Sequence, residues 1–110
     1  MLENPVNDLV LAAKDLPLTG WTSLILGDAG TAKIKLFRVD PNGLAEEVHH
    51  EWSESLIMIE GQIDVELEGL IHTVAAGQHI HLPAGQAHSI CPGGHGVFIL
   101  VDPEPTKVRF

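Results

Sequence analysis

Residues 77–88, GQHIHLPAGQAH, are the most specific segment of the chain and indicate its fold. Its spacing is G-x5-P-x-G-x2-H, and each fixed position has a physical reason. Pro83 ends a strand because it lacks the N–H for a further ladder hydrogen bond. Gly85 then makes a tight turn, since glycine adopts a positive φ at little cost. The chain is expected to re-enter as a strand that directs His88 into the interior.

Short strands separated by Gly and Pro are predicted on both sides of this stretch. Residues 32–36 and 63–68 alternate apolar and charged side chains, and residues 96–102 are mostly apolar. No segment has a helical stripe longer than about ten residues. Seven or eight such strands predict an all-β sandwich or barrel. We expect residues 1–20 to form an N-terminal arm, as a short helix or an extended segment, and residues 21–110 to form the barrel domain.

Size and charge exclude several classes of protein. The 110 residues suffice for one domain, and 15 acidic against 6 basic residues give a net charge of −9. An acidic surface opposes binding to nucleic acid and to anionic membranes. No apolar run approaches the roughly 20 residues that span a bilayer, and no signal peptide is evident. The single cysteine, Cys91, cannot form an internal disulfide, so a reduced, cytoplasmic location is expected.

The 77–88 stretch resembles the second motif of the cupin superfamily, whose histidine is a metal ligand. The resemblance covers residues 32–101, and over these residues the chain is similar to small single-domain bacterial cupins. It implies a double-stranded β-helix, or jelly-roll, barrel in which His88 binds a metal. The chain departs from the family pattern at Pro92, where the family has an asparagine. That departure lies away from the ligand itself.

The first cupin motif, G-x5-H-x-H-x(3,4)-E-x6-G, is matched at its two ends. Gly43 and His49 fit its beginning, and Glu54 and Gly61 fit its end. The middle is degenerate, because only one of the two family histidines is cleanly placed in any register. This segment therefore leaves its metal ligands open, whereas the second motif assigns His88.

Three registers remain open for the middle of this motif. In the first, His49 is a ligand and Glu51 replaces the second histidine. In the second, His50 is a ligand, because His50-x3-Glu54 keeps the family spacing without a gap. In the third, His49-x4-Glu54 makes His49 the second histidine, and Glu47 takes the place of the first. Strand alternation puts His49 and His50 on opposite faces unless a bulge intervenes, and the ungapped spacing favours His50.

The resemblance thus implies a divalent metal held by Glu54, His88 and at least one of His49 and His50. A complete cupin site would bind Fe, Mn, Ni or Zn. Glu54 would act as an anionic ligand or as a general base in catalysis. The leading hypothesis is a metal-binding cupin that binds or acts on a small polar organic molecule by Lewis-acid chemistry. The alternative is a metal-free binding or sensor module, and the sequence does not decide whether the protein is an enzyme.

Two further expectations concern partners and side chains outside the motifs. Exposed sheet edges predict a homodimer, with residues 9–11 as a candidate arm toward the second copy. His79 and His81 share one strand face, so if that face lines the barrel they either join the pocket or are hydrogen-bonded lining residues. Trp21 and Trp52 are expected to pack in the core or in the dimer interface rather than to stack on a ligand.

Overall fold

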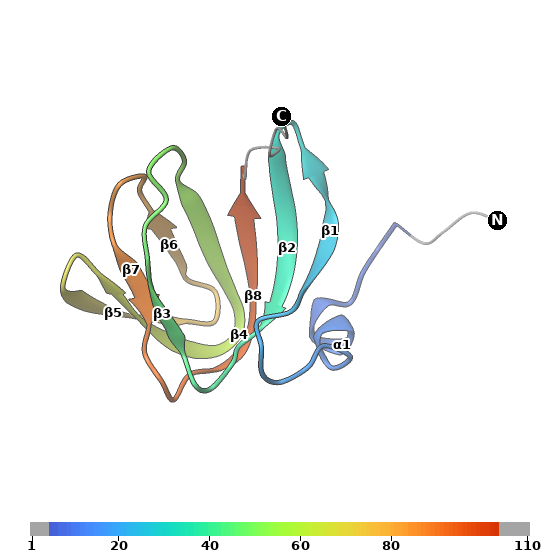
Figure 1. Cartoon of the computed structure of the whole chain (residues 1–110). Helices are drawn as coiled ribbons and strands as arrows, with labels where there is room; N and C mark the ends of the chain where they lie inside the picture. The colour runs from blue at the N-terminus through green and yellow to red at the C-terminus, as the bar shows by residue number, and fades with distance from the viewer. Residues whose placement is uncertain (1–4, 104–110) are drawn as a thin grey trace.

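The computed structural model describes residues 5–103 as one short helix and two packed layers of antiparallel strands (Figure 1). The predicted all-β class and the short helical segment near the N-terminus are confirmed. The elements are α1 (Leu9–Ala13), β1 (Ser23–Ala29), β2 (Ala32–Arg38), β3 (Leu44–Glu47), β4 (Glu54–Leu67), β5 (Leu70–Ala75), β6 (His79–Leu82), β7 (His88–Ile90) and β8 (His95–Asp102).

Strand β4 connects the two layers, because its two halves pair with different strands. The first half lies between β6 and β8, and the second half lies between β5 and β7. Figure 1 shows the strand curving from one layer to the other. The bend follows a register shift between Met58 and Glu60. Gly61 lies just after this shift with a φ of 82°, and a Cβ there would collide with the carbonyl oxygen of His95.

The space between the layers is filled by the inward-facing residues of β4 and its neighbours. Because side chains alternate along a strand, every second residue of β4 points inward on each side of the bend. This inner core consists of buried aliphatic, methionine and phenylalanine side chains: Val39, Leu56, Met58, Ile63, Val65, Val74, Leu82, Ile90 and Phe98.

A second apolar cluster lies outside the barrel, beneath α1. Leu36 of β2 is fully buried there and packs with Ala13 of the helix and with Ile99 of β8. The alternation of β2 therefore turns the opposite face, which carries Lys35 and Phe37, toward the interior.

The helix is capped by Asp8, whose carboxylate accepts a hydrogen bond from the Leu11 amide at 3.0 Å. The helix packs on its own barrel through Leu9, Ala12 and Ala13, while Leu11 is 61 % exposed. The predicted domain boundary after residue 20 stays a prediction. Among residues 5–103, no helix has the length and apolar character needed to cross a membrane.

Candidate metal centre

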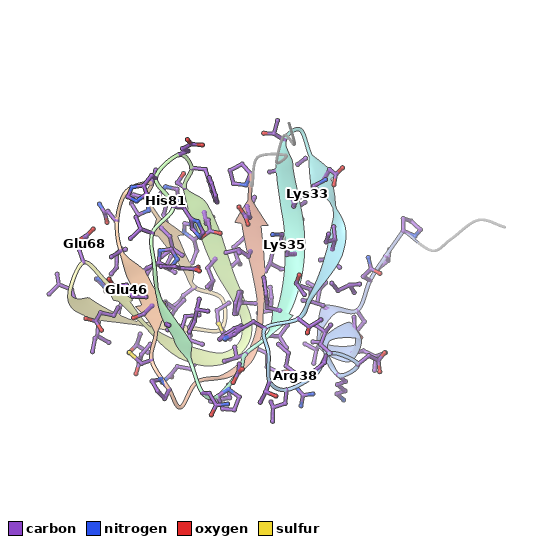
Figure 2. The ribbon with its side chains drawn as sticks, in the orientation of Figure 1. Lys33, Lys35, Arg38, Glu46, Glu68 and His81 are labelled. Carbon is purple, nitrogen blue, oxygen red and sulfur yellow. The ribbon has the colours of Figure 1, made fainter. Side chains whose placement is uncertain are left out.

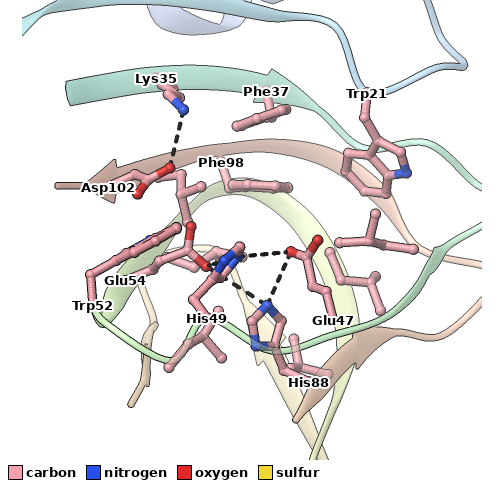
Figure 3. A pocket seen from close by; sticks show the side chains of 16 residues that line it. Trp21, Lys35, Phe37, Glu47, His49, Trp52, Glu54, His88, Phe98 and Asp102 are labelled. Carbon is pink, nitrogen blue, oxygen red and sulfur yellow. Dashed lines mark hydrogen bonds and ion pairs between the residues drawn. The ribbon is translucent and has the colours of Figure 1, made fainter. Parts of the chain in front are cut away.

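Four ligating side chains from three segments of the chain meet inside the barrel (Figure 3). They are Glu47, His49, Glu54 and His88, and one ligand atom from each lies within 4.8 Å of all the others. Glu54 and His88 are each 5 % exposed, while Glu47 and His49 are half-buried. The cluster is therefore largely enclosed but can still be reached from one side.

Strand pairing places three of the four side chains. Glu54 and His88 are the first residues of β4 and β7, and both belong to the inward-facing sets of those strands. Glu47 ends β3 and lies directly opposite His88 in the β3–β7 register. A register shift between Leu44 and Glu47 allows Leu44 and Glu47, which are three residues apart, to face the interior together.

His49 lies after the end of β3 and is held by two contacts. Its carbonyl oxygen accepts a hydrogen bond from the Gly85 amide at 2.8 Å. Its ring stacks on the indole of Trp52, with a centroid distance of 4.6 Å and an interplanar angle of 25°. The hydrogen bond fixes the backbone of His49, and the stack fixes the plane of its imidazole ring.

The predicted turn before His88 is present. Gly85 has a φ of 81°, and the Gln86 amide donates to the carbonyl oxygen of Pro83 at 3.3 Å. The positive φ expected at Gly85 is confirmed.

The separations of the ligand atoms fit one metal ion. His49 Nε2 lies 3.4 Å from Glu47 Oε1 and 3.4 Å from Glu54 Oε1. His88 Nε2 lies 3.2 Å from Glu47 Oε1 and 3.7 Å from Glu54 Oε1. Ligands bound at about 2.0–2.2 Å to a single ion lie roughly 3.0–3.6 Å apart. Three of the separations fall in this range, and the one between His88 and Glu54, 3.7 Å, is slightly longer. Two imidazole nitrogens and two carboxylate oxygens also form a donor set that suits first-row divalent metals.

The pKa of the Glu54 carboxyl is raised from 4.5 to about 7, and the largest cause is burial. The neighbouring carboxylates of Asp102 and Glu47 contribute to this rise, and His49 opposes it. Asp102 is 5 % exposed, and one of its oxygens, Oδ2, lies 3.1 Å from Lys35 Nζ. The buried carboxylate of Asp102 therefore lies beside Glu54, and Lys35 is paired with it (Figure 3).

The structure brings together three of the four predicted metal ligands. His49, Glu54 and His88 belong to the cluster, and Glu47, which only one register included, is the fourth member. His50 is exposed and lies outside this group, contrary to the spacing argument that favoured it. Glu47 and His49, two residues apart, both reach the cluster, so the separation of His49 from His50 by alternation agrees with the structure, and only the ungapped spacing favoured His50.

The other two histidines considered for the pocket face outward. His79 and His81 are both exposed on β6, and His81 Nδ1 lies 3.1 Å from the Ser55 hydroxyl (Figure 2). Neither histidine lines the cavity, so both expectations for this pair were wrong in placing it inside the barrel.

The roles of Trp52, Lys35 and Asp102 were not found in the sequence. Lys35 alternates with apolar residues, which is the usual pattern of a solvent-facing lysine. Asp102 ends an apolar strand, where an acidic residue is ordinary. Only the structure shows that both line the interior cavity.

Comparison with known proteins identifies the fold. A family model described as cupin domain matches residues 35–107. A cupin-2 domain containing protein from Shewanella frigidimarina is 17 % identical, with a TM-score of 0.81 over 91 % of this chain and 96 % of that one. A protein from Thermus thermophilus is 18 % identical, with a TM-score of 0.74 over 93 % and 100 % of the two chains. No curated protein matches the sequence. At these identities, the structural likeness shows the fold alone.

Proposed function

The chain belongs to the cupin family, and on that premise we propose that its barrel binds a small organic molecule beside one divalent metal ion. The observation that carries this proposal is the convergence of four ligand atoms within 4.8 Å of one another in a largely enclosed site. Buried clusters of histidines and carboxylates with this spacing are characteristic of metal sites.

Each of the four residues has a distinct part in this proposal. His49 and His88 would bind the ion as neutral imidazoles through Nε2, and Glu47 and Glu54 would bind it as carboxylates. Fe, Mn, Ni and Zn are the candidate ions for such a mixed nitrogen and oxygen set. The ion would supply Lewis-acid polarisation of an oxygen on the bound molecule.

One member of the cluster, Glu54, can hold a proton, and two residues beside it support its carboxyl group. Asp102 lies against Glu54 and is itself paired with Lys35. With a pKa of about 7, Glu54 exchanges a proton near neutral pH when no ion is bound. We propose Glu54 as the ligand or general base of any reaction in this barrel, and Asp102 as the residue that positions its carboxyl group.

A metal-free binding module is the second candidate, and one observation favours it. His88 Nε2 lies 3.2 Å from Glu47 Oε1, which is hydrogen-bonding distance. The cluster can therefore be partly satisfied by its own side chains, so the barrel could fold and bind a ligand without an ion.

Elemental analysis separates the two candidates. His79 and His81 are exposed imidazoles on one strand face, so the test uses a His79→Gln/His81→Gln background that removes them as competing ligands. This protein is purified without chelators and without a metal-binding tag. The proposal expects about one equivalent of a transition metal, and almost none in the same protein with His88→Ala. If neither protein contains or takes up metal while both remain folded, the binding-module candidate replaces the first.

A further inference from the structure

The cavity beside the metal centre is polar on one side only. It has a volume of about 410 Å³ and lies between the two layers of the barrel (Figure 3). The four cluster residues, Lys35 and Asp102 are its polar lining, and the remaining lining residues are aromatic or aliphatic. A molecule that fills this cavity must therefore place much of its surface against apolar walls.

Part of the apolar wall is aromatic. Trp21, Phe37 and Phe98 contact one another, with ring centroids 6.2, 6.1 and 5.2 Å apart. Trp21 Nε1 donates a hydrogen bond of 3.0 Å to the carbonyl oxygen of Gly43, so its polar atom is satisfied by the protein. Trp21 and Phe37 are only half-buried, which leaves ring surface facing the cavity. Such surfaces favour a flat apolar ligand.

The charges in the cavity are already balanced before any ligand arrives. Lys35 is paired with Asp102, and their side chains are 15 % and 7 % exposed. Two glutamates would balance one divalent ion, and histidine ligands are neutral. Among the described residues that line the cavity, there is no further lysine or arginine. A dianionic group such as a phosphate would therefore be buried without a counter-charge, which is costly.

We propose that the ligand of this barrel is a single-ring aromatic molecule, or one of similar flat apolar shape, with a neutral or singly charged oxygen group that reaches the metal. This inference rests on the proposed metal centre and names the ligand class of that site. An apolar cavity of about 150 Å³ holds one benzene ring. The observed volume therefore accommodates one substituted ring together with the space around the ion.

Three simple probes test the ligand class on the zinc-loaded protein: benzoate, acetate and phenyl phosphate. Benzoate and acetate share a carboxylate, whereas benzoate and phenyl phosphate share a ring. Both tryptophans of the chain line the cavity, so their fluorescence reports occupancy directly. Benzoate is expected to bind at least about tenfold more tightly than acetate because of the buried ring. It is also expected to bind more tightly than phenyl phosphate.

A variant of the aromatic wall tests the same idea from the protein side. Phe37→Leu is expected to weaken benzoate binding about fivefold, with acetate binding and zinc content unchanged. The matched control is Leu70→Ala, because Leu70 is 67 % exposed on β5, outside the cavity lining. Equal affinity for benzoate and acetate, or tightest binding of phenyl phosphate, would overturn the ligand class. Zinc content measured on the same samples detects a failure of the metal centre separately.

Discussion

The amide of Gly85 donates a hydrogen bond of 2.8 Å to the carbonyl oxygen of His49. This bond joins the turn before His88 to the segment that carries the other histidine of the cluster. The two histidine rings lie 5.6 Å apart between centroids. The turn therefore sets the separation of two proposed ligands from distant parts of the chain, and its geometry should matter for both stability and metal binding.

Replacing Gly85 by valine should destabilise the protein by about 1–3 kcal/mol, because a β-branched residue is strained at a φ of 81°. Metal affinity should fall as well, since the bond to His49 depends on this turn. Denaturant melts and metal titration measure the two effects. Gly27→Val is the matched control, because Gly27 has no positive φ and open space around its Cβ position. An unchanged unfolding midpoint for Gly85→Val would contradict the assigned role of the turn.

The sequence predicted the barrel and the position of His88 because Pro83, Gly85 and His88 lie in one continuous local motif. Local turn chemistry determines such a segment, so spacing alone is informative. The choice between His49 and His50 could not be made in the same way. It depends on which face of this segment meets the interior, and this is fixed by the pairing of β3 with β7, a strand far along the chain.

The position of Lys35 in the cavity lining could not be predicted from the sequence, for a related reason. Alternation along β2 divides it into two faces, but both faces are covered in the folded protein. Ile34 and Leu36 pack toward α1, and Lys35 and Phe37 face the cavity. The pattern identifies the faces, and only the position of the helix determines which face lies outside.

Trp52 should act as a positioning residue for His49. Trp52→Leu removes the stacked indole and should lower metal affinity about tenfold, as the loss of a residue that orients a ligand does. Trp52→Phe keeps an aromatic face and should recover most of this affinity. Competition titration with a metallochromic chelator measures both variants. Equal affinity for wild type and Trp52→Leu would show that the stack has no effect on the site.

The stability of the metal-free protein should depend on pH through Glu54. The folded-state pKa of about 7 lies above the ordinary value of 4.5. Protonated Glu54 therefore stabilises the native state below about pH 4.5, and this contribution is lost as the pH rises through 7. Glu54→Gln should remove this decline and be the more stable protein at pH 8 in the presence of EDTA. Thermal melts from pH 5 to 8 with parallel slopes for the two proteins would contradict the assignment.

We also predict a homodimer in solution, with strand β1 in the interface. β1 ends the strand order among the described residues, and its Ile25 is 57 % exposed. An unpaired edge with exposed apolar residues is commonly covered by a second copy. Light scattering should give the dimer mass for wild type and the monomer mass for Ile25→Lys. A monomeric wild type at micromolar concentration would exclude this prediction.

The most direct test of the metal centre compares neighbouring histidines in one experiment. Zinc is titrated by calorimetry at pH 7.5 into wild type, His49→Ala, His50→Ala and His88→Ala, all with His79→Gln and His81→Gln and all checked for folding. His50 is the matched control, because it is exposed beside His49 and lies outside the cluster. We predict one tight site in wild type and in His50→Ala, and at least about a hundredfold weaker binding in His49→Ala and His88→Ala. Loss of zinc in His50→Ala with retention in His49→Ala, or no binding by wild type, would contradict this account.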